Sequence, residues 1–377
     1  MTQVFLEKEG GNSAGTSVTQ VRLFHYRNYP ELDLALSPGL NVLYGQNAQG
    51  KTNLLEALYL LSSTRLLRGS KDAEAILEGE GQARVSAELA PSRTELAIVL
   101  EAAKRKIASL NKVGLPRAAD LIGRLPSVCI SAFDMEIVRG SPDSRRLFLD
   151  MEISQLSVAY LNQLAAYKRA LEQRNALLRR SQEEPVDSLE FEPWEAVLAE
   201  HGAAVRTARQ NLVQSLSPHA QALQSALALE EALRLSYEPK DETHTPEEAL
   251  RALQTSRTRD VARGSTSVGP HRDDLAIFVQ DRDVRYFGSQ GQQRTAVLAL
   301  KLAACLHHRE SKGEMPLLLL DDILSDLDES RRKSLVAWIL QNARQALLTC
   351  TEPAAAGPGL IEKASLFRVE SGRITPE

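Results

Sequence analysis

The chain has 377 residues, of which 43% are hydrophobic and 25% are charged, and its formal net charge is −4. This composition is ordinary for a globular protein, and no stretch reaches the apolar length of a membrane span, which argues against a membrane protein. The acidic balance gives no global attraction to nucleic acid, so any DNA binding must come from a local basic surface.

The ends of the chain and its cysteines give two further expectations. Residues 1–17 include a run of small residues and lack the apolar core of a signal peptide, so they are predicted to be a disordered leader or start-site extension. The cysteines, at positions 129, 305 and 350, have no CxxC spacing. Free thiols in a reducing cytoplasm are therefore expected, with neither a zinc site nor a disulfide framework.

A phosphate-binding loop is predicted near the N-terminus. Two short strands, with a turn at Arg27 and Asn28, precede the apolar run 40–44, which leads into G-Q-N-A-Q-G-K-T at 45–52 and an apolar-periodic segment at 54–61. This strand, loop and helix fit the P-loop pattern, in which backbone N–H groups and a helix N-terminus bind a polyphosphate. Lys51 is expected to bridge the β- and γ-phosphates, and the Thr52 hydroxyl to coordinate Mg²⁺. The predicted nucleotide contacts here are Arg27, Asn28, Gly45, Gln46, Asn47, Ala48, Gln49, Gly50, Lys51, Thr52 and Asn53.

A basic edge follows the P-loop helix. A polar loop carries Arg65, and strand-like runs at 83–89 and 95–101 are followed by clustered lysines and arginine. Such a surface suits phosphate contacts, although charge runs are more often simply solvated. The candidate DNA contacts are Arg65, Lys104, Arg105, Lys106 and Lys112.

The composition changes near residue 150. After a buried strand at 125–131, the segment from about 150 to 259 is rich in Ala, Leu, Gln, Glu and Arg, with apolar residues at helical spacing. Turn residues predict breaks at 184–187, 217–218 and 237–240, which leave segments too short for a long coiled coil. A compact inserted helical domain is therefore expected at 150–260, between two parts of one α/β domain at 18–149 and 261–377.

Strands and helices alternate again beyond residue 264. Strands are predicted at 275–279, 284–286, 317–320 and 345–349, and helices at 291–306 and 329–342, which indicates α/β structure with a parallel sheet. The strand at 317–320 ends in Asp321 and Asp322, as a Walker B element requires. Asp321 is expected to hold Mg²⁺ together with Thr52, and Asp322 to orient or deprotonate the attacking water. The predicted catalytic residues are Lys51, Asp321 and Asp322.

The segment S-Q-G-Q-Q at 289–293 opens a helix after a loop, so it offers a second anion site. Helix caps with Ser and Gly are common, but a dimer would use both sites. In such a dimer Ser289, Gly291 and Gln292 of one subunit close on the γ-phosphate held by the other subunit's P-loop. Asp326, shortly after the Walker B strand, is placed to reach across the same interface.

These motifs together resemble the SMC-type branch of ABC ATPases, and within it the RecF family. The resemblance rests on R-N-Y at 27–29, the P-loop, the segment 289–293, Asp321-Asp322 and S-D-L-D at 325–328. Further pointers are R-R-L-F-L-D at 145–150, G-P-H-R-D-D at 269–274, and a short helical insertion where SMC proteins carry a long coiled coil. The resemblance covers residue 18 to the end and implies an ABC/SMC-type ATPase head with a mixed sheet.

The resemblance also implies a function. It indicates an ATP- and Mg²⁺-dependent homodimer that binds double-stranded DNA and the single-strand/double-strand junctions of gaps. With RecR and RecO, such a protein helps to place RecA on single-stranded DNA, in recombinational repair, replication and the SOS response. Members of the family are weak, DNA-stimulated ATPases, in which ATP closes the dimer on DNA and slow hydrolysis releases it.

Two departures from the wider ABC pattern predict slow hydrolysis. Asp322 is one methylene shorter than the usual glutamate, and Cys350-Thr351-Glu352 stands where many relatives carry a switch histidine. No glutamine near 131–136 suits the Q-loop role.

Two alternatives have less support. An ABC subunit of a transporter predicts a membrane partner and a signature closer to LSGGQ, and it leaves 269–274 and the helical insertion unexplained. A small-molecule kinase or GTPase predicts a lid or an NKxD motif, but Asn111-Lys112-Val113-Gly114 lacks the aspartate that would bind guanine.

Overall fold

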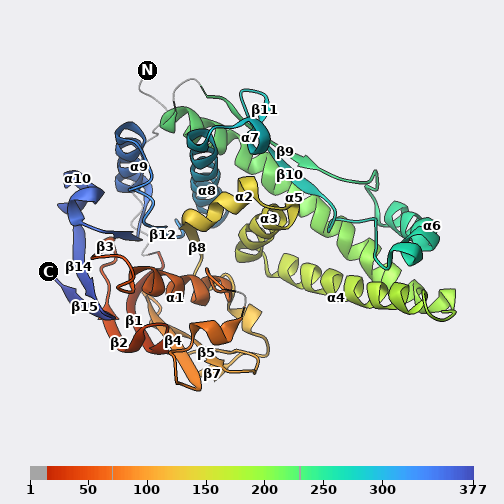
Figure 1. The fold of residues 1–377 in the computed structure, drawn as a ribbon, viewed down its shortest axis with the longest axis horizontal. Coiled ribbons are helices and arrows are strands. Elements are labelled where there is room, and N and C mark those ends of the chain that lie inside the picture. Colours follow the sequence, from red (N-terminus) through yellow and green to blue (C-terminus); the bar gives the residue numbers. More distant parts are fainter. Residues whose placement is uncertain (1–14, 70, 229–230) are drawn as a thin grey trace.

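The computed structural model describes residues 15–69, 71–228 and 231–377. Figure 1 shows a globular head, to which the N-terminal and C-terminal parts of the chain both contribute strands, and a helical arm that projects from it. The predicted leader lies almost wholly outside the described residues. Ser17 already belongs to the first strand and pairs with Ala90, so the ordered head begins one residue before the predicted boundary.

A mixed sheet forms the centre of the head. Its order is β15-β14-β3-β13-β12-β8, and all neighbours are parallel except β14 and β15. The strands are β3 Leu40–Tyr44, β8 Ser127–Ile130, β12 Leu317–Asp321, β13 Ala346–Cys350, β14 Ala364–Glu370 and β15 Arg373–Pro376. The central strands are apolar and buried on both faces, as parallel strands usually are. The α/β fold with a mixed sheet is thereby confirmed, and the C-terminal ends of β3, β13 and β12 lie along one edge.

A second sheet covers one face of the first. It is antiparallel, in the order β2-β1-β4-β5-β6-β7. Helix α1, Lys51–Ser63, lies between the two sheets, and its Leu54, Leu58 and Leu61 are fully buried in the core that they share. The strands are β1 Ser17–Tyr26, β2 Tyr29–Ala35, β4 Gln82–Ala90, β5 Thr94–Glu101, β6 Ile107–Leu110 and β7 Val113–Gly114.

Helices cover the other face of the central sheet. Helix α8, Gln290–Lys312, packs against β8 and against the long helix α5, Glu192–Leu227. A small antiparallel sheet, β11-β10-β9, lies beside them. Its strands are β9 Leu233–Glu238, β10 Asp274–Val279 and β11 Arg282–Asp283. The remaining helices of the head are α2 Met135–Arg139, α3 Pro142–Leu156, α7 Val284–Phe287, α9 Glu329–Asn342 and α10 Pro358–Ile361, with short 3-10 turns at Asp72–Ala75, Ala118–Leu121, Ala132–Asp134 and Pro353–Ala356. A further 3-10 turn, Ser188–Glu190, lies between α4, Val158–Arg180, and α5.

We call α4, Val158–Arg180, the first half of α5, and α6, Pro246–Arg263, the arm (Figure 1). Tyr167, Leu198 and Leu253 form its small apolar core. The fully buried Arg174 donates to Asp260 at 2.8 Å and to Glu195 at 3.1 Å. Because an unpaired charge inside a protein is costly, these carboxylates and Arg174 fix the three helices relative to one another.

Three expectations about local structure are wrong. Pro218 lies inside α5 instead of breaking it, because Leu216 and Ala220 are fully buried on either side and tertiary packing outweighs the lost N–H. Residues 284–287 form α7, since the Asp283 carboxylate accepts the Arg285 N–H and starts a helical turn. The block expected to be helical contains β9, which pairs with β10 beyond it.

Across the described ranges, no helix is both long enough and apolar enough to span a membrane.

Candidate nucleotide site

The P-loop turns sharply between β3 and α1. Gly45 has φ 146° and Gly50 has φ 117°, both outside the range that L side chains favour. A Cβ at Gly45 would lie 2.3 Å from the carbonyl oxygen of Val369, and one at Gly50 would lie 2.8 Å from Asn28 Nδ2 and Tyr29 Oη. Glycine is therefore required at both ends of the loop, by its backbone conformation and by its neighbours.

Lys51 reaches back across the loop that precedes it. Its Nζ donates to the carbonyl oxygens of Gly45 at 2.5 Å and of Gln46 at 2.7 Å. Burial lowers the pKa of Lys51, although the nearby Asp322, Cys350 and Asp321 favour the charged form. The side chain thus places a partly desolvated cation inside the loop, where a bound phosphate would be stabilised most strongly.

Thr52 and Asp321 meet as the sequence predicted. The Thr52 hydroxyl donates to Asp321 Oδ1 at 2.7 Å, and the Thr349 hydroxyl donates to the same oxygen at 2.9 Å. Mg²⁺ prefers hard oxygen ligands and usually takes one or two from the protein, with the rest from water and phosphates. The hydroxyl of Thr52 and the carboxylate of Asp321 fit such an ion, and Thr349 would orient the carboxylate.

Asp322 lies directly beyond the strand in a left-handed conformation, with φ 52°. Its N–H donates to Thr349 Oγ1 at 2.9 Å, and its Oδ1 accepts the Ser325 hydroxyl at 3.0 Å. A non-glycine residue in this region of conformational space is uncommon and often marks a functional site. Next to it, burial raises the pKa of the Cys350 thiol to about 11, so Cys350 is neutral at physiological pH and cannot act as a base there.

Asn28 and Arg27, in the β1–β2 turn, make hydrogen bonds to the P-loop and to the helix that follows it. Asn28 Nδ2 donates to the carbonyl of Gln49 at 3.0 Å and its Oδ1 accepts from Asn53 Nδ2 at 2.7 Å. The guanidinium of Arg27 donates to Glu56 of α1 at 2.8 and 3.1 Å and to the carbonyls of Arg68 and Glu74. Asn28 thus touches the P-loop directly, whereas Arg27 is held against α1, and a phosphate contact by Arg27 stays a prediction.

Ser289 caps the N-terminus of α8 and is exposed. Its hydroxyl accepts the Gln292 N–H at 3.2 Å, and Gln292 Oε1 accepts the Ser289 N–H at 2.9 Å. In Figure 1, α7 and this end of α8 lie well apart from α1 and the P-loop. Arg294, one turn into α8, donates to the Asp326 carbonyl at 3.1 Å, which places the predicted interface loop beside Ser289. The chain therefore holds its two candidate anion sites apart from each other.

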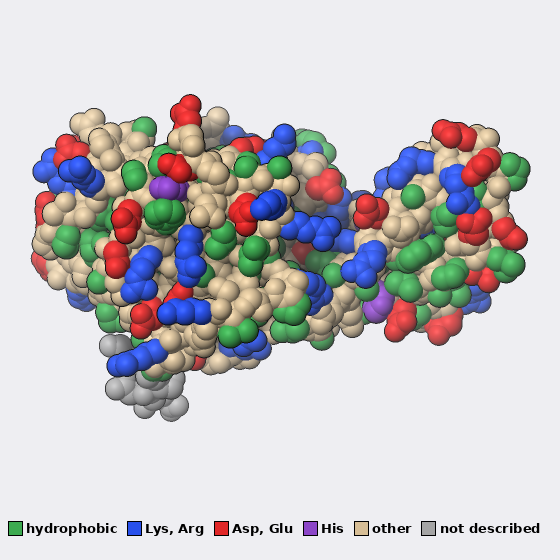
Figure 2. All heavy atoms as spheres, turned by 90° about the horizontal axis from the view of Figure 1, so that it is seen from below, with side chains coloured by type: hydrophobic (Ala, Val, Ile, Leu, Met, Phe, Trp, Pro, Cys, Tyr) green, Lys and Arg blue, Asp and Glu red, His purple; other side chains and the backbone are tan. Residues whose placement is uncertain are grey.

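The candidate DNA contacts lie around the antiparallel sheet β2-β1-β4-β5-β6-β7. The side chains of Arg65, Lys104, Arg105 and Lys112 are exposed, while Lys106 donates to Asp72 and to the Thr64 carbonyl, each at 2.8 Å. Figure 2 shows basic and acidic side chains interspersed over this side of the molecule. Their role in DNA binding stays a prediction, and Lys106 has a structural partner of its own.

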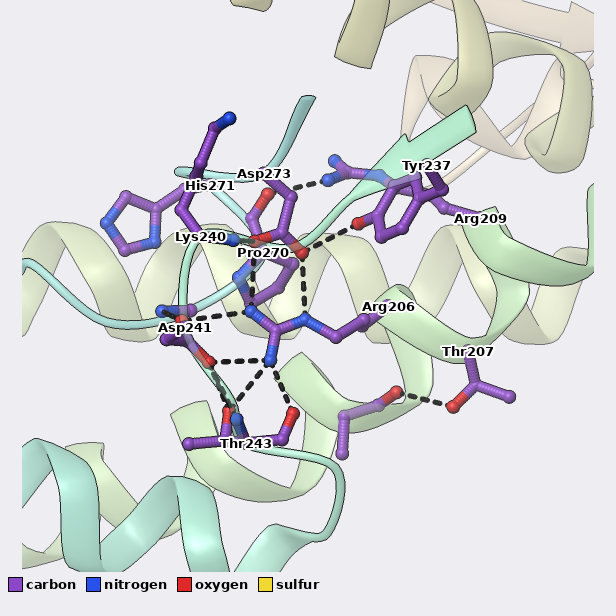
Figure 3. Close-up of polar contacts among 12 residues, drawn as sticks. Arg206, Thr207, Arg209, Tyr237, Lys240, Asp241, Thr243, Pro270, His271 and Asp273 are labelled. Atoms are coloured by element: carbon purple, nitrogen blue, oxygen red, sulfur yellow. Dashed lines mark hydrogen bonds and ion pairs between the residues drawn. The ribbon is translucent and has the colours of Figure 1, made fainter. Parts of the chain in front are cut away.

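The segments R-R-L-F-L-D and G-P-H-R-D-D meet where the arm joins the head, away from α1 and the P-loop. Figure 3 shows the polar contacts around the second segment. Asp273 is fully buried and accepts Arg206 Nε at 2.8 Å, Arg206 Nη2 at 2.9 Å, Tyr237 Oη at 2.8 Å and the Lys240 N–H at 3.1 Å. Arg206 also pairs with Asp241. We call Arg206, Tyr237, Lys240, Asp241 and Asp273 the Asp273 cluster.

Neighbouring pairs extend the cluster to α3. Arg145 donates to Asp274 at 2.7 and 2.9 Å, and Asp150 accepts from Arg209 at 2.9 Å. These motifs therefore fix the arm to the head.

Sequence reasoning missed several residues of the site. Thr349, Tyr29, Ser371 and Gly372 all contact the P-loop or Asp321. Thr349 could have been found from the parallel sheet, because the end of β13 must lie beside the end of β12. For Ser371 and Gly372, the sequence shows only a Ser-Gly turn, which does not indicate a contact with the P-loop.

Comparisons with known proteins agree with this geometry. Residues 17–358 match the family model described as the RecF/RecN/SMC N terminal domain. The chain is 38% identical over 368 residues to the DNA replication and repair protein RecF of Heliobacterium modesticaldum, covering 95% of this chain and 98% of that protein. It is 37% identical over 359 residues to RecF of Lactococcus lactis, with 95% and 98% covered.

Solved structures of RecF and of Smc head domains also match this chain. A structure of the recombination mediator protein RecF with ATP in the RecFOR pathway matches with a TM-score of 0.89 and 30% identity, over 98% of this chain and 100% of that chain. The Smc head domain of Pyrococcus furiosus matches with a TM-score of 0.56 at 14% identity, over 96% of each chain, which shows a shared fold.

Proposed function

Because the chain belongs to the RecF family, we propose that it is an ATP-dependent DNA-binding protein of replication and repair that works as a homodimer. ATP and Mg²⁺ would bind at the P-loop, Thr52 and Asp321, and a second copy would close on the γ-phosphate through Ser289, Gly291 and Gln292. The closed dimer would hold double-stranded DNA or a single-strand/double-strand junction at a gap. With RecR and RecO it would promote RecA loading, and so serve recombinational repair and the SOS response.

One observation carries this proposal: the two candidate anion sites lie apart in the chain, so neither completes the other within one copy. A P-loop that binds a triphosphate on its own leaves the γ-phosphate exposed, whereas Ser289 offers a helix N-terminus with no acidic side chain in its first turn. The exposed aromatic side chains of Tyr286 and Phe287 precede Ser289, and such side chains often mark protein contacts. A second copy of the chain supplies what each site lacks.

The residues at the end of β12 support slow turnover. Lys51, Thr52 and Asp321 would bind and neutralise the phosphates, while Asp322 would orient the water. Asp322 is one methylene shorter than glutamate and its Oδ1 already accepts the Ser325 hydroxyl, so its reach to the water is reduced. ATP would therefore act as a switch whose hydrolysis resets the dimer.

The test measures dimerisation by light scattering with ATP, ADP or no nucleotide, with and without gapped DNA. Lys51→Arg and Ser289→Arg should each abolish the ATP-dependent dimer. Thr245→Arg is the matched control, because Thr245 is an exposed cap with the same reciprocal capping box at the start of α6. This variant loses a similar helix cap, but position 245 lies in the arm, so ATP-dependent dimerisation should persist.

Mixing the two variants tests the shared site directly. A mixed dimer contains one complete site, built from the P-loop of the Ser289→Arg chain and the Ser289 of the Lys51→Arg chain. ATP should therefore restore dimers in the mixture that neither variant forms alone. Monomers under every condition would contradict the proposal, and so would an ATP-dependent dimer of Ser289→Arg.

A further inference from the structure

The C-terminal hairpin contacts the P-loop directly. Strand β14 pairs in parallel with β3, with Arg368 opposite Tyr44, so the hairpin continues past the end of β3 at the point where the P-loop begins. The two-residue turn between β14 and β15 is Ser371-Gly372, with φ of 48° and 73°, as in the turns that favour tight hairpins. We call this dipeptide the C-terminal turn.

Both N–H groups of the C-terminal turn donate to one residue of the P-loop. The Ser371 N–H donates to Gln49 Oε1 at 2.6 Å, and the Gly372 N–H donates to the Gln49 carbonyl at 3.1 Å. The same carbonyl accepts from Asn28 Nδ2 at 3.0 Å. Gln49 is therefore held through its side chain and its main chain by two segments far from it in the sequence.

These contacts set the direction of a phosphate-binding group. The peptide between Gln49 and Gly50 is trans, so its carbonyl and its N–H point to opposite sides. Because Asn28 and Gly372 both donate to the carbonyl, the Gly50 N–H must point away from these two residues, and we infer that it faces into the loop. A P-loop binds phosphate through N–H groups turned inward in this manner.

No room is left for a side chain at position 372 of the C-terminal turn. Gly372 is buried, and a Cβ there would lie 2.5 Å from the carbonyl oxygen of Asn28. The opposite end of the P-loop has a similar constraint from the same hairpin, since Gly45 abuts the Val369 carbonyl. A side chain at position 372 must therefore displace either the turn or Asn28, and both of them hold Gln49.

We propose that the C-terminal turn positions the P-loop, so that Ser371 and Gly372 are positioning residues for nucleotide binding although neither touches the nucleotide. The inference rests on the proposed use of the P-loop for ATP, but it does not depend on dimer closure. ADP, which lacks the γ-phosphate, reports on the P-loop alone and is therefore the probe.

The test compares Gly372→Ala with Gly313→Ala. Gly313 has φ 77°, close to that of Gly372, but a Cβ there meets nothing within 4 Å. Both variants bear the same kind of backbone strain, so the unfolding midpoint without nucleotide should fall in each, and further in Gly372→Ala because its Cβ also meets the Asn28 carbonyl. The Kd for ADP should rise about tenfold in Gly372→Ala, as loss of a hydrogen bond to a charged phosphate predicts, and stay within twofold of wild type in Gly313→Ala.

Two further variants keep the test decisive. Ser371→Gly removes only the 3.4 Å contact of the hydroxyl with Gln49 Oε1 and keeps the N–H that positions Gln49, so a Kd for ADP within twofold of wild type would show that Ser371 acts through its main chain. Gly372→Asn serves if Gly372→Ala does not fold, because asparagine tolerates this conformation better while its Cβ keeps the contact with Asn28. An unchanged Kd in the Gly372 variant overturns the inference alone. Failure of the wild type to bind ADP overturns it together with the nucleotide site, whereas ADP binding without an ATP-dependent dimer overturns only the proposed clamp.

Discussion

Replacing Asp273 with asparagine should destabilise the protein by about 3 kcal/mol. Each carboxylate oxygen of Asp273 accepts two donors: Oδ1 takes Arg206 Nη2 and the Lys240 N–H, and Oδ2 takes Arg206 Nε and Tyr237 Oη. In either orientation the amide nitrogen of asparagine faces two of these donors. The Tyr237 hydroxyl can rotate to accept from it, but at least one N–H of Arg206 or Lys240 stays unpaired.

The magnitude follows from burial. Removing one partner of a buried ion pair typically costs about 3–5 kcal/mol, and one unsatisfied buried donor costs about 1–3 kcal/mol. Arg206 keeps its pair with Asp241, at 2.7 and 2.9 Å, so the lower end of the larger range applies. The free energy of unfolding should therefore fall by about 3 kcal/mol, measured by urea titration at pH 7.

Asp281→Asn provides the control. The Asp281 side chain is 90% exposed, and its contact with Arg234 spans 3.6 Å. That variant should stay within about 0.5 kcal/mol of wild type, as surface substitutions usually do. ADP affinity should be unchanged in both variants, because the Asp273 cluster lies away from the P-loop. A loss below about 1 kcal/mol in Asp273→Asn would show that the cluster does not hold the arm to the head.

Three other outcomes are expected. Burial opposes ionisation of Asp241, but hydrogen bonds from Arg206, Thr243 and the Gly269 N–H hold its pKa below the ordinary value. Asp241→Asn should therefore cost about 2 kcal/mol at pH 7. The difference in urea stability from wild type should shrink below about pH 4, because the carboxyl group then takes up a proton in the unfolded chain while the native carboxylate is still ionised. Asp321→Asn should weaken the Mg²⁺ dependence of ATP binding in titrations of the metal, while Mg²⁺-free ADP binding changes little. Lys106→Ala should lower the free energy of unfolding by about 1 kcal/mol through loss of its hydrogen bonds to Asp72 and Thr64, whereas Lys112→Ala should leave it unchanged. Each replaced lysine that contacts DNA should reduce the slope of log DNA affinity against log salt concentration by about one.

The sequence predicted the local parts of the site well. A P-loop needs glycines, a lysine and a hydroxyl at fixed spacing, so β3, the loop and α1 could be recognised together. The meeting of Thr52 with Asp321 followed from the parallel sheet, because the carboxyl ends of its strands share one edge. The strand predicted at 317–320 and the helix predicted at 329–342 are present as β12 and α9.

Contacts between distant segments could not be predicted in the same way. Arg27 was expected beside the phosphates, which stays a prediction, but its pairing with Glu56 on α1 could not be foreseen from its own segment. Pro218 was expected to end a helix, yet burial of its neighbours on α5 carries the helix through. In each case a charge or a turn residue was interpreted from its own segment, whereas its conformation is decided by a partner outside that segment.

The same long-range contacts join the arm to the surface that carries Ser289. Helix α5 packs along α8 inside the main core and continues without a break into the arm. The Asp273 cluster fixes α5 to the loop before β10, and Arg139 of α2 donates to Gln293, whose amide in turn donates to the Val284 carbonyl. Buried, fully paired groups of this kind resist separate movement. We therefore expect the arm and the N-terminus of α8 to move as one body, so that closure on a nucleotide through Ser289 also sets the positions of the two arms of a dimer.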